Sequence, residues 1–465
     1  MARVAAKVKQ YCHQTTNGPV SEPPTEIRSH CCAVLRKKLS ARATTRCLAL
    51  AAVTTIVDDG HVRGKVLLKA VQRGLLSARV RRYESAEGPG GVPQAHSSGV
   101  NPDRILVFGT GPAIGHGVQS HKLALPGQLA AAITAVTGRG ADVDLVASPD
   151  ISIENAIENL GARELDRYDV IVVFLGVSDA LTLLPVGTYR VNLDDFVLFA
   201  LTESPVATRI TFVAVEPLRS FVSWDARIRP DVDKHARLLN EATRDAVAGN
   251  PRLSYLSLPA SRGQVERQRS DREYREWAEA IAIELAPTLD AAAGIDPSSI
   301  VGNASSASRP RLGQDDEKRL AAVEALGILD SPADARIDRI VEAARERFGT
   351  TSAAFTLIDR DRQWYKSAAG TDDTGSTLGD SICTTTVQQA GAFIVPDTDL
   401  DPRFDHLTKL RFYAGFPIES PDGQRIGALC VFDPAPHAAS TVDQAELRDL
   451  ALEIQHELWR YLPAG

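Results

Sequence analysis

Residues 411–433 have the sequence RFYAGFPIESPDGQRIGALCVFD. Apolar residues dominate on both sides of Asp422-Gly423, a dipeptide that favours a tight hairpin turn. The stretch therefore predicts two antiparallel strands. Around it, residues 313–465 show the pattern of a leading helix, a run of strands and a closing helix. This order is typical of an α+β domain.

Four further stretches accompany the hairpin: EKRLAAVEALGILDSP (317–332), LIDRDRQWYKS (357–367), DSICTTTV (380–387) and VPDTDLDPRF (395–404). Together these segments resemble the GAF family over almost all of residues 313–465. Their order and spacing are similar to those of a bacterial subgroup whose members often lie beside kinase, cyclase or transcription-regulating domains. The resemblance implies a small-molecule-binding or signal-relay module, a signalling partner protein and a homodimer formed through this module.

A sheet with helices on one side and a loop cap on the other encloses a partly apolar pocket with a few polar groups. Trp364 and Tyr413 could instead be core residues, and Arg411 could pair with an acidic residue of the loop. The candidates for lining the pocket are Trp364, Lys366, Cys383, Asp397, Arg411 and Tyr413.

The ligand of this pocket is not specified by its cysteines. Thr384 follows Cys383, whereas His usually follows the attachment cysteine of bilin-binding GAF domains, so a tetrapyrrole is disfavoured. Cys383 aligns loosely with a cysteine of the GAF proteins that reduce free methionine sulfoxide. A thiol mechanism needs an exposed thiolate and a resolving thiol nearby. The partner cysteines of those proteins are missing here and Cys430 lies inside a predicted strand, so we expect no resolving thiol beside Cys383. An unknown small molecule is expected, and no cofactor is predicted.

Residues 104–292 show a different pattern, in which short β-branched runs alternate with helical stretches. The runs are RILVF (104–108), VDLVA (143–147), VIVVFL (170–175), ITFVAV (210–215) and LSYLSL (253–258). Such alternation predicts an α/β domain with three layers, a flavodoxin-like parallel sheet between two layers of helices. Ligands of such sheets lie at the carboxyl ends of the strands.

Two interpretations compete for the turn after the first strand, which contains TGPAIGHG (110–117). The glycines fit the pyrophosphate-binding turn of short-chain dehydrogenases. These NAD(P)-dependent reductases also need a Tyr-x-x-x-Lys pair, which the chain lacks.

The favoured interpretation rests on four blocks in order. They are GTG (109–111), TGRGADVDLVA (137–147), FLGVSDAL (174–181) and SDREYREWAEAIA (270–282). These blocks resemble those of the SGNH (GDSL-like) hydrolases. The resemblance implies a cleft that contains Gly109, Thr110, Gly111, Gly176, Ser178, Asp179, Asp271 and Tyr274.

The departures from the family pattern argue against catalysis. Gly111 stands where the family has its nucleophilic Ser, Ser178 where it has an oxyanion-binding Asn, and Tyr274 where it has the His base. A tyrosine with a pKa near ~10 is a poor base at neutral pH. We therefore predict no catalytic residue and an inactive hydrolase-like domain. The alternative is an esterase with a relocated nucleophile, and the candidate substitutes are Thr110, Ser152, His116 and His121.

The N-terminal region differs in charge from the rest of the chain. Residues 1–83 contain 16 Lys and Arg against 4 Asp and Glu, whereas the whole chain has a net charge of −7. We predict a poorly ordered basic extension over 1–60, a basic amphipathic helix over 61–83 and linkers over 84–103 and 293–312.

The composition predicts a cytoplasmic location. No apolar run approaches the ~20 residues that a membrane span needs, and no C-x-x-C pair or other metal site is present among the six cysteines. Contact of residues 1–83 with nucleic acid or membrane is not favoured. The sequence as a whole predicts a sensory or regulatory protein in which an inactive SGNH-like domain is joined to a GAF domain.

Overall fold

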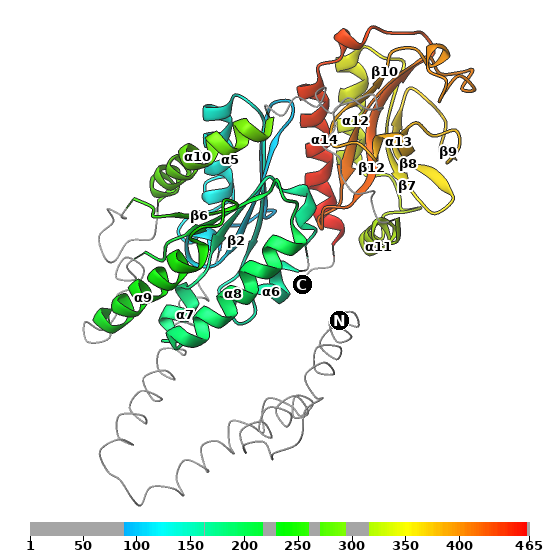
Figure 1. Cartoon of the computed structure of the whole chain (residues 1–465). Coiled ribbons are helices and arrows are strands. Elements are labelled where there is room, and N and C mark those ends of the chain that lie inside the picture. Colours follow the sequence, from blue (N-terminus) through cyan, green and yellow to red (C-terminus); the bar gives the residue numbers. More distant parts are fainter. Residues whose placement is uncertain (1–87, 162, 217–228, 260–269, 294–315, 463–465) are drawn as a thin grey trace, which may run out of the picture. The chain divides into compact units, whose positions relative to one another are not determined.

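The computed structural model describes residues 88–161, 163–216, 229–259, 270–293 and 316–462 (Figure 1). The expected basic extension (1–60) and amphipathic helix (61–83) lie outside these ranges. So does the expected linker 293–312, apart from Ala293. The described residues form two modules, which both belong to one compact unit.

The first module is an α/β domain with a six-stranded sheet in the order β1-β3-β2-β4-β5-β6. All neighbouring strands from β3 to β6 are parallel, and only β1 is antiparallel, to β3. The strands are β1 (Gln94–Ser97), β2 (Asp103–Gly109), β3 (Ala141–Ala147), β4 (Val170–Phe174), β5 (Arg209–Val213) and β6 (Leu253–Leu256).

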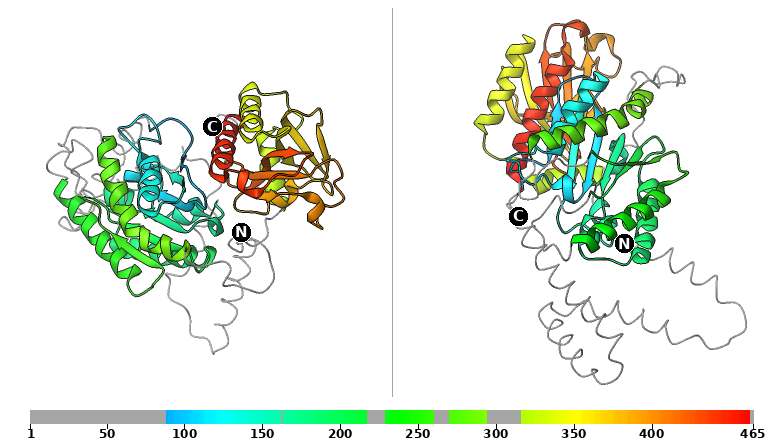
Figure 2. Two further views of the ribbon diagram at one scale, coloured as in Figure 1. Left: turned by 90° about the horizontal axis from the view of Figure 1, so that it is seen from above. Right: turned by 90° about the vertical axis from the view of Figure 1, so that its left-hand side faces the viewer.

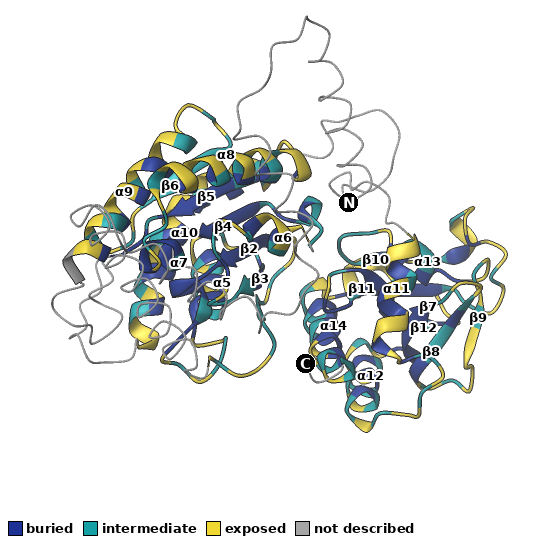
Figure 3. Cartoon of the chain, turned by 90° about the horizontal axis from the view of Figure 1, so that it is seen from below, coloured by how far each residue is buried: buried dark blue, intermediate teal, exposed yellow. Residues whose placement is uncertain are grey.

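Helices cover both faces of this sheet, which gives the predicted three layers. α5 (Leu125–Thr137) and α10 (Asp271–Ala293) lie side by side on one face (Figure 2). The other face is covered by α6 (Ala156–Leu160), α7 (Val177–Leu181), α8 (Val186–Glu203) and α9 (Arg229–Val247). The central strands are buried on both faces, and the outer surfaces of α8 and α9 are exposed (Figure 3).

The five predicted strands correspond to β2–β6, so the predicted α/β class is confirmed. β1 is a correction, because it lies inside residues 84–103, which were expected to be a linker. It pairs with the edge strand β3, with Ala95 opposite Val143 and His96 opposite Asp142. Its sequence, QAHS, has no β-branched apolar residue, so pairing to an existing edge decides its conformation rather than propensity.

The second module has an antiparallel six-stranded sheet in the order β10-β11-β12-β7-β8-β9. Its strands are β7 (Ser352–Ile358), β8 (Arg362–Ala369), β9 (Gly375–Thr377), β10 (Phe393–Val395), β11 (Phe412–Glu419) and β12 (Arg425–Asp433). The predicted Asp422-Gly423 turn joins β11 to β12, and Gly423 has a φ of +93°. The Gly423 amide donates to the Ser420 carbonyl at 2.8 Å.

The two faces of this sheet are covered differently. α11 (Asp316–Leu326), α12 (Ala335–Phe348) and α14 (Gln444–Leu458) pack on one face around an apolar core. The Asp443 side chain accepts from the amides of Ala445 and Glu446, which begins α14. A second apolar cluster lies on the opposite face, under the four-residue helix α13 (Cys383–Thr386) and the loops that precede β11. We call residues 378–411 the cap.

Candidate functional site

Two cysteine side chains meet beneath the cap. Cys383 is the first residue of α13 and Cys430 lies in the middle of β12, and their Sγ atoms are 3.8 Å apart. Both residues are buried. A disulfide has an S–S distance of about 2.05 Å, so this pair is in the reduced form. The expectation that Cys383 lacks a neighbouring thiol is wrong, because β12 brings Cys430 to it from 47 positions along the chain.

Tyr413 and Thr386 complete a small polar cluster around these thiols. The Tyr413 hydroxyl lies 3.2 Å from Sγ of Cys383 and 2.6 Å from Oγ1 of Thr386. Tyr413 and Thr386 are buried as well. The structure thus brings together two of the predicted pocket residues, Cys383 and Tyr413, with two that were not predicted.

The cluster distinguishes its two thiols electrostatically. Burial opposes ionisation of Cys383, but hydrogen bonds from Cys430, Thr356 and Tyr413 outweigh it and lower the pKa of this thiol. The hydrogen bond to Cys383 and burial together raise the pKa of Cys430 well above its ordinary value. Cys383 is therefore the thiol that ionises more readily, and Cys430 stays protonated.

An apolar shell surrounds the cluster. Its members come from the cap and from the facing strands: Ala354, Ile358, Ile382, Val387, Phe393, Val395, Phe404 and Ala428. Arg403 lies over this shell, with its guanidinium carbon 5.3 Å from the ring centre of Phe393 and 5.1 Å from that of Phe404. Polar groups enclosed by apolar walls are the usual composition of a small-molecule site.

Asp397 and Arg411 hold the two ends of the outer cap loop together. The Arg411 guanidinium donates through Nε and Nη2 to the two carboxylate oxygens of Asp397, at 2.7 and 2.8 Å. It also pairs with Asp399 at 3.0 Å. These hydrogen bonds lower the pKa of Asp397. The alternative that Arg411 pairs with acidic loop residues is therefore what the structure shows.

Trp364 and Lys366 lie apart from the thiol cluster. Trp364 packs against the core on the helix-covered face of the sheet. The Lys366 ammonium donates to the Ser331 hydroxyl at 2.7 Å and the Pro332 carbonyl at 2.5 Å. Both contacts precede α12, so these two predicted pocket residues are on the opposite side from Cys383. Alternation along β8 accounts for this, because one face of the strand points to each layer.

The hydrolase-like cleft lies at the carboxyl ends of β2 and β4. The Thr110 amide donates to the Phe174 carbonyl at 2.9 Å and joins the two strand ends. Gly111 follows with a φ of +64°, and a Cβ atom there would lie 2.8 Å from Cγ2 of Val177. Gly109 and Gly176 also have positive φ values, of +129° and +101°. A side chain at position 111, where the sequence resemblance leads us to expect the nucleophile, would thus meet Val177 of α7, and Gly111 itself has no hydroxyl.

The other cleft positions have structural partners. Ser178 donates to the Pro149 carbonyl at 3.1 Å, and Tyr274 donates to the His116 carbonyl at 2.9 Å. Tyr274 thus reaches the loop that follows β2, whereas Asp271 is exposed and pairs with Arg275 at 3.9 Å.

Asp179 is the unusual group of this cleft. It is buried at the first turn of α7, and both carboxylate oxygens lie 3.2 Å from the Ile153 amide. Burial raises the pKa of Asp179 to about 7, and the nearby charge of Glu154 adds to this effect. In the described part of the chain, no three His, Cys, Asp or Glu side chains are placed to hold a metal ion.

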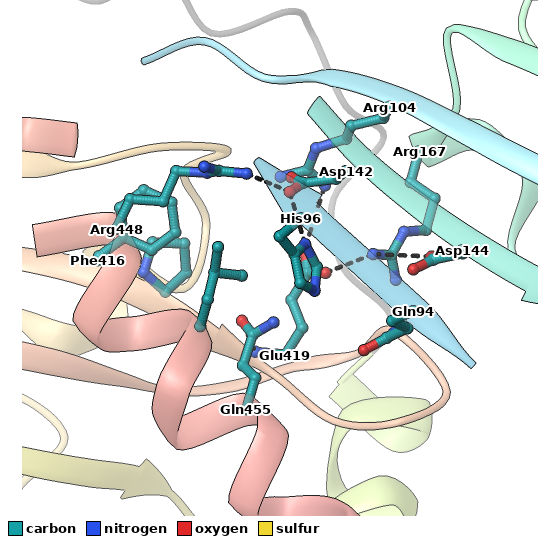
Figure 4. A pocket seen from close by; sticks show the side chains of 12 residues that line it. Gln94, His96, Arg104, Asp142, Asp144, Arg167, Phe416, Glu419, Arg448 and Gln455 are labelled. Atoms are coloured by element: carbon teal, nitrogen blue, oxygen red, sulfur yellow. Dashed lines mark hydrogen bonds and ion pairs between the residues drawn. The ribbon is translucent and has the colours of Figure 1, made fainter. Parts of the chain in front are cut away.

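Charged side chains of the two modules meet in a buried interface (Figure 4). We call it the ionic interface. Arg448 of α14 is 1% exposed and pairs with Asp142 of β3. Burial alone would raise the pKa of Asp142, but the charge of Arg448 and the contact with His96 hold it well below its ordinary value. Nδ1 of His96 lies 2.7 Å from the same carboxylate.

Glu419, at the end of β11, provides the second half of the ionic interface. It pairs with Arg104 at 3.2 Å and also with Arg167. Arg167 lies 3.4 Å from Asp144, whose carboxylate accepts from the Tyr168 hydroxyl. These ion pairs are buried, and Nε of Arg167 and Nε of Arg448 have no hydrogen-bond partner among the described residues. Sequence reasoning missed these residues, because charges on a helix or strand edge are usually solvated.

Comparison with known proteins identifies the second module. Residues 332–457 match the sequence model described as the GAF domain. A cyclic di-GMP phosphodiesterase of Pseudomonas aeruginosa is 35% identical over 133 residues, which cover 27% of this chain and 23% of that protein. The chain therefore spans less than a quarter of that relative.

Several solved structures are similar to part of the chain. The type II free methionine-R-sulfoxide reductase of Thermoplasma acidophilum covers 28% of this chain and 93% of its own, with 17% identity and a TM-score of 0.25. The GAF domain of an Acinetobacter phosphoenolpyruvate-protein phosphotransferase covers 31% and 94%, with 14% identity and a TM-score of 0.24. The lipase/acylhydrolase of Enterococcus faecalis covers 40% and 96%, with 18% identity and a TM-score of 0.32.

Proposed function

Since residues 332–457 form a GAF domain, we propose that this chain is a sensory or regulatory protein whose GAF module binds a small molecule beneath the cap. The observation that carries the proposal is the enclosed cluster of Cys383, Tyr413 and Thr386 within an apolar shell. These groups offer hydrogen bonds to a ligand that also buries apolar surface. The expected ligand is thus a small organic molecule with one polar group.

Opening of the cap is the step that admits this ligand. The regular structure of the cap is short: α13, the three-residue strand β10 and a 3-10 turn at Thr398–Leu400. Its outer loop is held by the pairs that Arg411 makes with Asp397 and Asp399. Local opening of one segment costs less free energy than unfolding of the whole domain. A ligand that binds only the open or only the closed cap shifts the balance between the two states.

A direct structural path connects the cluster to the ionic interface. β11 contains Tyr413 near its start and Glu419 at its end. A displacement of β11 beneath the cap therefore changes the distances from Glu419 to Arg104 and Arg167 in these ion pairs. We propose that the α/β module receives the signal through these pairs.

The α/β module acts in this proposal as a receiver without hydrolase activity. Gly111 has no nucleophilic side chain, and the Tyr274 hydroxyl donates a hydrogen bond to the His116 carbonyl. Self-association also belongs to the proposal, but the face of α14 that contains Arg448 is covered by the α/β module. A homodimer formed through the GAF module would therefore use another surface.

The proposal is tested by thermal unfolding of the full chain in the presence of a panel of small metabolites of different chemical classes. At least one compound is expected to raise the Tm of the wild type, because a ligand that binds only the folded state stabilises it. Tyr413→Phe and Thr386→Val should abolish or weaken that shift. Lys409→Ala, an exposed change in the same cap, should leave it intact. A shift that survives both cluster variants would place the ligand elsewhere.

A further inference from the structure

Cys383 and Cys430 have the arrangement of a reactive thiol and a resolving thiol. Their Sγ atoms are 3.8 Å apart, and they come from two different elements, a one-turn helix in the cap and a central strand. Among the described residues, the two thiols do not belong to a group of three or more side chains that could hold a metal ion.

The hydroxyl of Tyr413 faces the sulfur of Cys383 and not that of Cys430. It lies 3.2 Å from Cys383, and Thr386 fixes it from the other side at 2.6 Å. A hydrogen bond to a sulfur stabilises its thiolate, which is the nucleophilic form. The lowered pKa of Cys383 and the raised pKa of Cys430 agree with this division of roles.

We propose that Cys383 and Cys430 are a peroxide-reactive pair that closes to a disulfide, so that hydroperoxides are a signal of the GAF module. The inference rests on the proposed sensory function and names one class of its signal. Both thiols are 2% exposed. Hydrogen peroxide, which is close to water in size, therefore reaches them when the cap opens locally.

The reaction balances as two steps. The Cys383 thiolate attacks one oxygen of the hydroperoxide, the O–O bond breaks, and the departing alkoxide or hydroxide takes a proton from solvent. Cys383 is now a sulfenic acid. Cys430 then attacks this sulfur, the S–O bond breaks, and the departing hydroxide takes the Cys430 proton to form water. Two thiols are oxidised and one hydroperoxide is reduced to an alcohol, or to water, plus a second water.

Disulfide closure also moves the cap. The sulfurs must approach from 3.8 Å to about 2.05 Å. β12 is fixed between β11 and β7, whereas α13 is a single turn, so α13 makes most of this movement. The movement displaces Thr386, which is on the same turn, and so changes its 2.6 Å contact with the Tyr413 hydroxyl of β11.

The test uses the full chain with Cys12, Cys31, Cys32 and Cys47 replaced by Ser, so that two thiols remain. After treatment with hydrogen peroxide, intact mass should fall by two hydrogen atoms, and proteolysis should yield a linked peptide that contains both cysteines. In Cys430→Ser, Cys383 should stop at a sulfenic acid that dimedone traps. Tyr413→Phe should slow disulfide formation roughly tenfold, because it removes a hydrogen bond that stabilises the Cys383 thiolate.

Tyr365→Phe is the matched control, because it removes a nearby phenol that is not among the hydrogen-bond donors to Cys383. It should leave the rate unchanged. The inference is overturned if both thiols stay reduced in peroxide, or if Cys383 proceeds to a sulfinic acid while Cys430 stays reduced. A metabolite that stabilises the wild type but not Tyr413→Phe, together with inert thiols, would overturn this inference and leave the proposed function standing.

Discussion

A Cβ atom on Gly111 would lie 2.8 Å from Cγ2 of Val177, and Gly111 has a φ of +64°. A side chain at this position is thus opposed both by its backbone conformation and by a neighbour on α7. Gly111→Ser should lower the free energy of unfolding by about 1–3 kcal/mol. Urea denaturation measures this. Gly187→Ser, where a Cβ meets nothing within 4 Å, is the control and should change the stability by less than about 0.5 kcal/mol.

The same position predicts the outcome of attempts to restore hydrolysis. Wild-type protein should hydrolyse no short-chain aryl ester. Gly111→Ser and Tyr274→His should each recover little, because loss of a nucleophile or base costs on the order of a million-fold and the losses are not additive. The double variant needs Val177→Ala as well, to make room for the new hydroxyl. Turnover by the wild type that disappears in Thr110→Val or Ser152→Ala would instead reveal a relocated nucleophile.

Arg448 should be the most sensitive charge of the ionic interface. Arg448→Ala leaves the buried carboxylate of Asp142 without its cation and should cost about 3–5 kcal/mol in the free energy of unfolding. The exposed pair Arg190–Asp245 is the control, and Arg190→Ala should cost less than about 1 kcal/mol. Calorimetry should also resolve two transitions in Arg448→Ala where the wild type shows one. Equal costs for the two variants would mean that the ionic interface does not join the modules.

Asp179 predicts a pH dependence of stability. Its folded pKa of about 7 exceeds the ordinary value of an unfolded Asp, about 3.9, so the folded state loses stability as pH rises between these values. Asp179→Asn removes this loss. The stability of the variant relative to the wild type should therefore rise by about 2–3 kcal/mol from about pH 5 to about pH 8. Asp194→Asn, on the exposed face of α8, should show no such trend. A flat difference for Asp179→Asn would refute the raised pKa.

The fold followed from local patterns that the sequence displays directly. The β-branched runs gave β2–β6, and Asp422-Gly423 marked the turn between β11 and β12. β1 was not predicted, because its pairing with β3 depends on an edge that exists only in the folded sheet. The periodicity of helices and strands also does not predict which residues of distant segments are in contact.

In the candidate site, too, the sequence patterns do not reveal contacts between residues of distant segments. Cys383 and Tyr413 are identified by their place in the GAF-like motifs, but the neighbour of Cys383 is Cys430 of β12, and a strand pattern does not show which distant residue a side chain faces. Arg448 was not recognised, since the spacing of α14 presents it as part of a charged surface. Its burial depends on the α/β module, which no pattern within the helix reveals.

Native mass spectrometry of the purified full-length chain tests the central claim most directly, namely that the GAF module holds a small molecule under its cap. The wild type should show a discrete mass above that of the polypeptide, which disappears on denaturation, and Tyr413→Phe with Thr386→Val should lose it. Gly111→Ser, which alters only the α/β module, should retain it. The bare polypeptide mass in the wild type, unchanged after incubation with a metabolite extract, would contradict the account.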